Sequence, residues 1–263
     1  KVGSGKVGLM QVTFLGTGTS VGIPMIGCSC RVCRSDDPKN KRNRPSILIA
    51  LGDKNILVDT SPEFRIQALT CGIDRIDAVL FTHSHADHLH GLDDLRIFSR
   101  TQTDPIPCFG NDFTLDRIRR AFDYIFNPKY YQGLLPNIKL ESINGPFPLL
   151  GQTVVPVKVW HGKTEVLGFR LGRFAYVTDC GLIPDESMEL LAGVEVLVLD
   201  ALRWEPPHPA HLTIPQAVRI SQQLGARQTY FTHMMHRVEH QETNARLPDG
   251  IQLAYDGLVI QID

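Results

Sequence analysis

The sequence predicts a mixed α/β protein in which two β-sheets pack together and helices cover their outer faces. Short apolar runs typical of strands occur early in the 263-residue chain and again late, with helical stretches between them. These runs do not alternate strictly with helices, which argues against a single parallel sheet. Hydrophobic residues make up 43% of the chain, enough to bury a large core.

The expected strands are short apolar runs that end at glycine or at a polar residue. The run 46–59 contains Gly52-Asp53 and is predicted to be a hairpin that turns at these residues. The run 78–83 stays apolar until Thr82-His83, which is typical of a buried strand. Further strands are expected over 10–18, 153–162, 166–179, 194–201 and 228–234.

Helices are expected where helical patterns lie between start and stop signals. In the stretch 61–72, Ser61 is the expected N-cap and Gly72 the stop. The stretch 213–225 has Thr213 as a candidate N-cap and ends at a glycine. Further helices are expected over 92–100, 115–126 and 184–193.

Charge and hydropathy disfavour several classes of protein. The formal net charge is −1, so no overall field points to nucleic acid or to an anionic membrane. No apolar run is long enough to cross a membrane, and the N-terminus lacks the apolar core of a signal peptide. We therefore expect a cytoplasmic protein with reduced thiols. Residues 1–9 are expected to be a disordered expression remnant, and 10–263 to form one domain.

A dense histidine cluster directly follows the apolar run 78–81. The string THSHADH places His83, His85, Asp87 and His88 within six positions. Imidazole and carboxylate are usual ligands of zinc, manganese and iron. Four ligands exceed what one tetrahedral ion with an open position needs, which indicates two metals. A solvated polar loop is the alternative, but it does not fit this spacing at the end of a buried strand.

Other residues of ligand type also end apolar runs. His161 follows VKVW, Asp179 follows FAYVT and His233 follows TYFT. Each alone would more often be a satisfied buried polar group, but their recurrence favours strand ends that converge at one rim of a sheet sandwich. Asp59 and Asp200 end two further runs and are candidates to accept hydrogen bonds from metal-bound histidines. For Asp59 an N-cap role is the alternative.

Three cysteines, Cys28, Cys30 and Cys33, lie in the stretch GCSCRVC. Three thiols are one short of a tetrahedral site, and an odd number does not pair into disulfides. In a reducing compartment clustered cysteines more often bind metal. The residues alone leave the fourth ligand open, and free thiols in a loop are the alternative.

Four further residues lie outside these clusters. Arg203 and Trp204 fit either a substrate pocket or core packing. His208 and His240 are expected at the surface.

The string THSHADH resembles the H-x-H-x-D-H signature of the metallo-β-lactamase-fold hydrolases, and three later residues match that superfamily's ligands in order and context. The resemblance covers nearly the whole chain from Met10. It implies an α/β fold, a four-layer αββα sandwich, with a dinuclear Mn²⁺ or Zn²⁺ site at one edge. By this match one metal is held by His83, His85 and His161, the other by Asp87, His88 and His233, and Asp179 bridges them.

A narrower resemblance rests on FLGTGTSVGIPMIGCSCRVC, AHLTIPQA and THMMH. These are similar to the phosphodiesterases of the carbon–phosphorus lyase pathway, which open a cyclic ribose phosphate. The resemblance implies that His236, three residues after His233, completes a structural Cys₃His zinc site with the three cysteines. It also implies a catalytic His211, as general acid or electrostatic clamp at the leaving group, whereas a surface residue at a helix start is the alternative. Asp87 is assigned to the catalytic residues as well as to the ligands.

The expected function is hydrolysis of a small nucleotide or ribose phosphodiester, cyclic or linear, through a metal-bridging hydroxide. The expected partner is that small molecule; nucleic acid and membrane are disfavoured, and a homodimer is left open. A ribonuclease Z-type endonuclease is one alternative, disfavoured by the neutral charge and the lack of a long inserted arm. A non-catalytic carrier similar to the pyrroloquinoline quinone biosynthesis protein is another, disfavoured because all seven ligand positions are filled.

Overall fold

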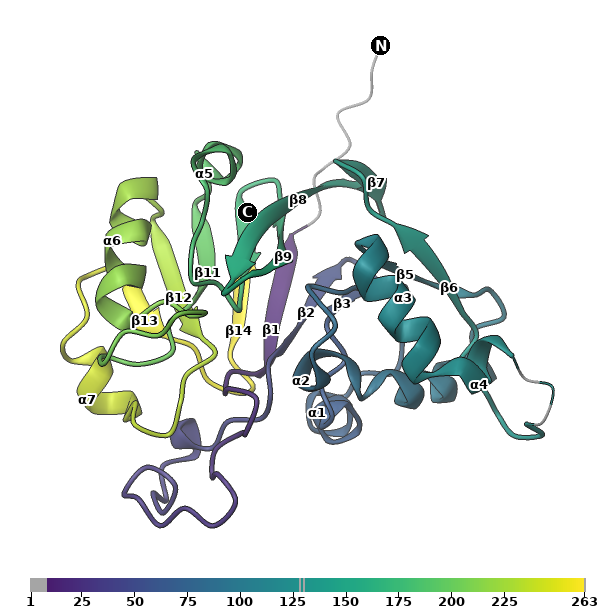
Figure 1. Ribbon diagram of the computed structural model, residues 1–263, viewed down its shortest axis with the longest axis horizontal. Coiled ribbons are helices and arrows are strands. Elements are labelled where there is room, and N and C mark those ends of the chain that lie inside the picture. Colours follow the sequence, from purple (N-terminus) through teal and green to yellow (C-terminus); the bar gives the residue numbers. More distant parts are fainter. Residues whose placement is uncertain (1–8, 128, 130, 263) are drawn as a thin grey trace.

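The computed structural model describes residues 9–127, 129 and 131–262, and its strands form two seven-stranded mixed sheets. The strand order is β14-β1-β2-β3-β4-β5-β6 in the first sheet and β13-β12-β11-β10-β9-β8-β7 in the second. Helices lie on the outer sides of the sheets (Figure 1). The predicted sandwich of two sheets between helices is confirmed. The expression remnant predicted over 1–9 lies, except for Leu9, outside the described residues.

The first sheet combines strands from both ends of the chain. Neighbours from β14 to β3 pair antiparallel, and neighbours from β3 to β6 pair parallel. The hairpin between β2 and β3 turns at Gly52-Asp53 as predicted, with a φ of 64° at the glycine. The strands are β1 (Met10–Gly16), β2 (Ser46–Leu51), β3 (Lys54–Val58), β4 (Ala78–Leu80), β5 (Ile106–Gly110), β6 (Ile138–Ser142) and β14 (Val259–Ile262).

The second sheet repeats this arrangement along the chain. Neighbours from β7 to β10 pair antiparallel, and neighbours from β10 to β13 pair parallel. The single run predicted over 166–179 is a hairpin of two strands, because Gly172 adopts a φ of 56° and turns the chain. The strands are β7 (Phe147–Leu149), β8 (Gln152–His161), β9 (Thr164–Leu171), β10 (Phe174–Val177), β11 (Val196–Asp200), β12 (Gln228–Thr232) and β13 (Ile251–Leu253).

The helices lie mainly in the connections between strands. None of those described has the length and apolar character needed to cross a membrane. The α-helices are α1 (Phe64–Cys71), α2 (Ala86–Leu89), α3 (Asp112–Ala121), α4 (Asp123–Phe126), α5 (Asp185–Leu191), α6 (Ile214–Leu224) and α7 (His240–Asn244), and 3₁₀ segments are η1 (Pro38–Asn40) and η2 (Leu92–Arg100).

Three helices differ from the predictions. The stretch 92–100 is a 3₁₀ helix, and the helix predicted over 115–126 is broken at Phe122, whose φ of −123° and ψ of 43° are not helical. The helix α1 begins only at Phe64, since the Ser61 hydroxyl accepts a hydrogen bond from the Glu63 amide before the helix starts. For α6, Thr213 is the N-cap and forms a capping box with Gln216.

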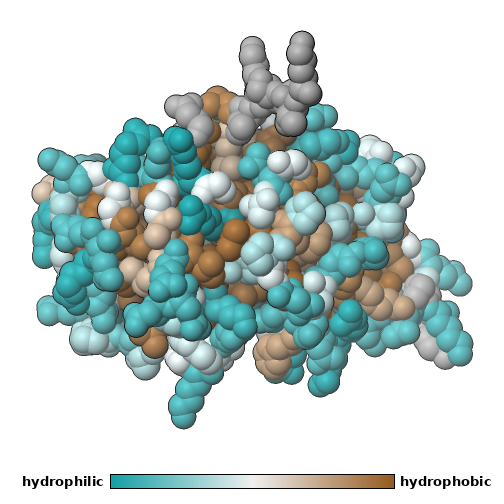
Figure 2. Space-filling model, turned by 90° about the horizontal axis from the view of Figure 1, so that it is seen from above, coloured by the Kyte–Doolittle hydropathy of each residue, from teal (hydrophilic) through white to brown (hydrophobic). Residues whose placement is uncertain are grey.

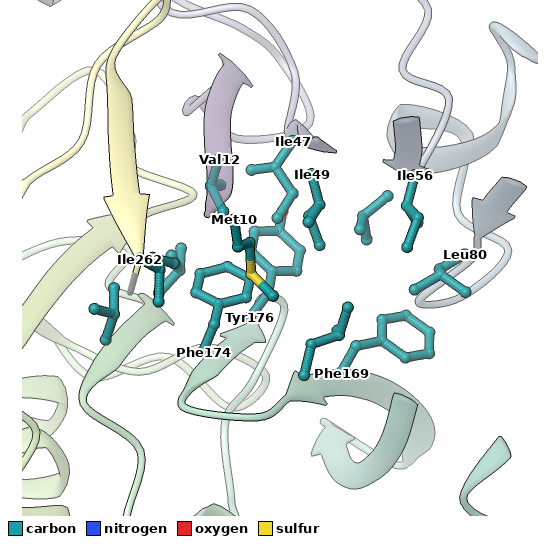
Figure 3. Close-up of a cluster of buried hydrophobic side chains, with 14 of the residues drawn as sticks. Met10, Val12, Ile47, Ile49, Ile56, Leu80, Phe169, Phe174, Tyr176 and Ile262 are labelled. Atoms are coloured by element: carbon teal, nitrogen blue, oxygen red, sulfur yellow. The ribbon is translucent and has the colours of Figure 1, made fainter. Parts of the chain in front are cut away.

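Three apolar layers hold the sandwich together. Side chains from the inner faces of both sheets, such as Ile47 and Phe169, meet in the central layer (Figure 3). A second layer lies between the second sheet and α5 and α6, and a third between the first sheet and α1, η2 and α3. Strands such as β4 and β11 are therefore buried on both faces and are apolar at almost every position.

A cavity of about 850 Å³ opens between α3, α5 and the β8–β9 hairpin. Its walls are partly apolar, with Phe113 and Leu190 among them. Figure 2 shows apolar side chains gathered in the middle of the face seen from above, between more hydrophilic ends. No predicted ligand lines this cavity, so it is separate from the histidine cluster.

A buried carboxylate links the two ends of the chain. Asp256 accepts hydrogen bonds from the Thr17 hydroxyl at 2.8 Å and from the Asn43 amide at 2.6 Å. Burial nevertheless raises the pKa of Asp256 to about 7, because desolvation outweighs these bonds and the nearby Arg42 charge. The folded state thus holds this proton more tightly than the unfolded state, so rising pH between about 4 and 7 reduces the free energy of unfolding.

The variant Asp256→Asn tests this effect. Asparagine does not titrate, so the variant should not share the loss of stability that the natural chain shows as pH rises. The free energy of unfolding of the variant minus that of the natural chain should therefore increase by about 2 kcal/mol from pH 5 to pH 8. Urea unfolding at both pH values measures the difference. The control is Asp53→Asn in the exposed β2–β3 turn. An equal pH response of the natural chain and Asp256→Asn would contradict the account.

Candidate metal centre

The ends of four strands bring seven side chains of ligand type to one rim of the sandwich. β4 leads into the histidine cluster, which continues onto α2, while β8, β10 and β12 end at or just before the later residues. The side chains form two groups, and within each the ligand atoms lie within 4.8 Å of one another. The groups are His83, His85 and His161, and Asp87, His88, Asp179 and His233.

Asp179 faces both groups. One carboxylate oxygen lies 3.3 Å from His233 Nε2 and 4.0 Å from His83 Nε2, and the other lies 3.1 Å from His88 Nε2. The Thr178 hydroxyl donates a hydrogen bond to the second oxygen at 2.9 Å. A carboxylate in this place can contact two cations at once.

Three imidazole nitrogens in the centre are buried near carboxylate oxygens but without a hydrogen bond. The Nε2 atoms of His83, His88 and His233 make no hydrogen bond to any residue that the structure describes. Buried polar atoms are almost always bonded, so three together indicate a missing common partner. Imidazole nitrogens facing carboxylate oxygens suit zinc and manganese, and the residues therefore fit divalent cations.

Hydrogen bonds at Nδ1 orient the imidazole rings of the centre and so determine where each Nε2 points. Asp59 accepts a hydrogen bond from His88 Nδ1 at 2.7 Å and another from the Thr82 hydroxyl at 2.8 Å. Because Thr82 donates to Asp59, its oxygen accepts from His83 Nδ1 at 3.0 Å. His161 Nδ1 donates to the Ala210 carbonyl at 2.9 Å. Each of these rings then turns its Nε2 inward, the nitrogen that would bind a metal once deprotonated.

Neither Thr82 nor Ala210 was predicted from the sequence. A threonine directly before His83 at a strand end is the only local signal for Thr82, and a backbone carbonyl leaves none. For Asp59 the structure decides between the two interpretations: it bonds His88, whereas α1 begins five residues later with Glu63 at its N-cap.

The backbone is strained at the same place. Asp59, Asp179 and His233 adopt φ values of 63°, 52° and 60°. This left-handed region is uncommon for residues other than glycine and costs on the order of 1–3 kcal/mol each. Leu150 is the remaining non-glycine residue with positive φ in the described part of the chain. The strain is thus concentrated where strands end and side chains turn into the centre.

Opposite charges govern protonation in the centre. Burial opposes every charge here, but His88 and His233 hold the pKa values of Asp87 and Asp179 well below their usual range. In return, carboxylates led by Asp179 raise the pKa of His88 well above its usual range and that of His233 to about 9. Burial, followed by the His88 charge, lowers the pKa of His83. A cation bound here takes the place of protons, so binding releases them.

His211 lies against this centre and is buried, so the surface interpretation is wrong. Its ring stacks on His233 at 4.7 Å and lies 4.5 Å from the ring of His161. Asp200 lies 3.2 Å from His211 Nδ1 and also accepts hydrogen bonds from the amides of Leu212 and Cys180. The same carboxylate also faces His233 Nδ1 at 3.6 Å, beyond hydrogen-bond distance, so it lies between the two rings and bonds only that of His211.

The other two histidines expected at the surface also differ. His208 is half-buried, with its ring 5.1 Å from that of His211. His240 is buried, because its amide bonds Asn40 and its ring packs against Tyr255. The contacts of His240 join residues far apart in the sequence, where no local pattern indicates them.

A second cluster lies beside the rim. The ligand atoms of Cys28, Cys30, Cys33 and His236 lie within 4.8 Å of one another, and His236 Nδ1 is 3.2 Å from Cys28 Sγ and 3.4 Å from Cys30 Sγ. Amide N–H groups of Met25 and Cys33 donate to two of the sulfurs. Burial opposes ionisation, but the Cys33 amide and His236 lower the pKa of Cys30 to about 6. Four such donors fit a closed zinc site.

Comparison with known proteins agrees with this geometry. The Beta-lactamase superfamily domain matches residues 54–234, and the chain belongs to this superfamily of metallo-hydrolases, whose fold implies divalent metal binding. Within it, the chain falls in the PhnP family. The crystal structure of a diphosphatase from that family is 44% identical, covers 97% of both chains and superimposes with a TM-score of 0.91.

Two further matches are informative. The octanoyltransferase of Porphyromonas gingivalis W83 is 41% identical over 97% of this chain, but the chain spans only 52% of that protein. Zn²⁺-bound PqqB from Methylobacterium extorquens shares the fold, with a TM-score of 0.79 at 19% identity over 96% of this chain and all of that one.

The hydrogen bond from His88 to Asp59 can be tested by Asp59→Asn. Asparagine tolerates the positive φ but replaces a carboxylate by a weaker acceptor, so zinc affinity should fall about 10–100-fold. Competition with a chromogenic chelator measures it. The control is Asp77→Asn, a similarly enclosed carboxylate that bonds the Asn55 amide at the opposite end of β4. Unchanged affinity in folded Asp59→Asn would show that the bond does not orient a ligand.

Proposed function

We propose that the chain is a dinuclear metal-dependent phosphodiesterase that cleaves a small nucleotide or ribose phosphodiester, cyclic or linear. The observation that carries this proposal is the place of His211. One of its ring nitrogens lies within 4.8 Å of ligand atoms of His161 and Asp179, so an imidazole outside the two ligand groups stands beside both. Such a residue is what protonation of a leaving alkoxide requires.

The ligands divide between two metals, which we take to be Mn²⁺ or Zn²⁺. His83, His85 and His161 hold one, Asp87, His88 and His233 hold the other, and Asp179 serves both. When bound, such cations lower the pKa of a coordinated water and neutralise charge developing on phosphoryl oxygens. Asp87 contributes as a ligand whose depressed pKa keeps it anionic.

The chain's own part in the reaction centres on His211. Asp200 lies against Nδ1, which fixes the ring and leaves Nε2 as the nitrogen for the substrate. When Nε2 also carries a proton, the ring is a cation that can donate to the leaving oxygen. Stacking on His233 holds this donor at the metal-ligand wall. The cysteine cluster has a structural role: with zinc bound, it would hold the loop 28–33 against the rim through His236.

The PhnP-family diphosphatase supports attack at phosphorus. Cleavage of a P–O–P link and of a P–O–C link begin with the same displacement at phosphorus and differ in the leaving group. A small phosphoric anhydride therefore belongs to the same substrate class as the proposed diesters.

Acyl chemistry is the second candidate, favoured by 41% identity to a protein called octanoyltransferase. Acyl transfer needs a nucleophile at the acyl carbon. Among the described cysteines, Cys180 is next to Asp179, but it is fully buried and burial raises its pKa well above the usual range. The centre thus favours hydrolysis over transfer through a thiol, and about half of that relative lies outside the match.

A pair of substrates separates these roles. Metal-loaded protein should hydrolyse bis(4-nitrophenyl) phosphate and a 2′,3′-cyclic nucleotide. His211→Asn should keep its metals, lose about 10²–10⁴-fold in kcat on the cyclic nucleotide, and lose less on the aryl ester, whose good leaving group needs little protonation. The steady-state rate and metal content are measured on the same samples.

The control variant is His90→Asn, an exposed histidine outside both ligand groups. Equal losses on both substrates would exclude proton donation by His211. Turnover of octanoyl-coenzyme A without any phosphodiester turnover would replace the proposal by thioester hydrolysis. Cleavage of precursor transfer RNA without small-diester turnover would favour the ribonuclease alternative.

A further inference from the structure

A second cavity lies on the loop 203–206, which leads along the chain to His211. It has a volume of about 410 Å³ and is lined by Arg203, Trp204, Glu205, Pro206 and Arg237. Two guanidinium groups against one carboxylate give it net positive charge. The sequence left open whether Arg203 and Trp204 pack in the core or line a substrate pocket; both line this cavity, and Trp204 also packs against the apolar layer beneath α5 and α6.

The two arginines are available to an anion. Arg203 donates to the carbonyls of Pro206 at 2.8 Å and Pro207 at 3.4 Å, so its position is fixed without a carboxylate partner. Arg237 is exposed and has no hydrogen bond or ion pair with any described residue. Glu205 pairs with neither of them in the described part of the chain.

Trp204, which lines the cavity together with the two arginines, is held by contacts on its ring and on its indole nitrogen. The Arg246 guanidinium lies 3.7 Å from the centre of the Trp204 ring, and the indole N–H lies 3.4 Å from the Thr243 hydroxyl. Arg203 Nη1 also lies 3.9 Å from the sulfur of Met235, two residues after His233. The cavity is therefore built on the segment that follows β12 and carries the ligands of both metal sites.

One loop forms both the cavity wall and the wall of the centre. After the carbonyl of Pro207, which bonds Arg203, the next residue is His208, whose ring lies 5.1 Å from that of His211. His208 Nδ1 accepts a hydrogen bond from the Ala210 amide, and the Ala210 carbonyl accepts one from His161. The loop 203–210 thus runs from the cavity wall to His211 and to the ligand candidate His161.

We propose that Arg203 and Arg237 form a leaving-group subsite, which selects substrates whose leaving group carries its own negative charge. The inference rests on the proposed function, because His211 marks the leaving-group side. Guanidinium groups bind phosphate and carboxylate oxygens in pairs of charge-assisted hydrogen bonds. Contacts so far from the reacting phosphorus contribute mainly to binding and act on KM more than on kcat.

Three esters of thymidine 5′-phosphate test the subsite, and they differ only in the leaving group. The first releases 4-nitrophenol, the second a carboxylated 4-nitrophenol, and the third, a diphosphate, releases 4-nitrophenyl phosphate. Arg237→Gln should lower kcat/KM at least tenfold for the two anionic leaving groups, mainly through KM, and less than twofold for the first. Arg237→Lys should restore part of the loss.

The matched control is Arg219→Gln, an exposed arginine of α6, which should change no rate. A response of the diphosphate alone would identify the subsite as selective for phosphate, and a response of both anionic esters as selective for anions in general. An equal effect of Arg237→Gln on all three esters, or none, would overturn the inference. If the metal-loaded natural chain cleaved none of them, the proposed function itself would fail.

Discussion

The rim of the sandwich is organised around one buried carboxylate, Asp179. Its two oxygens face imidazoles from both ligand groups at 3.1–4.0 Å, and burial would make its charge costly without those partners. The residue is the second after β10, which pairs with the parallel strand β11, and it has a left-handed conformation that turns its side chain into the centre. His83, His88 and His233 could bind a metal together with Asp179 only because their imidazoles face its carboxylate.

Outer groups fix the inner ones in a consistent way. Asp59 and Thr82 hold the rings that follow β4, a backbone carbonyl holds His161, and Asp200 faces His233 and His211 together. Each outer contact uses Nδ1, so each ring offers Nε2 to the centre. The contacts made at the strand ends therefore determine which ring nitrogen faces the centre and can bind metal.

The sequence predicted the architecture where local patterns are strong. Buried strands such as β4 and β11 are continuous apolar runs, and the β2–β3 turn has its Gly-Asp signal. Strands β5, β6, β7, β13 and β14 were missed because they are three to five residues long and several expose alternate positions. The spacing of apolar residues indicates neither the 3₁₀ geometry of η2 nor the break in the helix at Phe122.

For the site, residue type and strand-end position were enough to select the seven ligand candidates, which the structure brings together. His211 and His236 required a family resemblance, because their partners lie elsewhere in the sequence: Asp200 for the first, the cysteine loop for the second. The roles of Thr82 and of the Ala210 carbonyl depend on tertiary contacts alone, as does the buried position of His240.

The central claim is that Asp179 is shared by two metal ions. Anomalous X-ray scattering from crystals grown with manganese and zinc, recorded at both absorption edges, tests it most directly. The account predicts two peaks at the rim, each about 2 Å from an Asp179 oxygen, and a separate zinc peak among the three cysteines and His236. A single rim peak, or two peaks of which only one contacts Asp179, would contradict it.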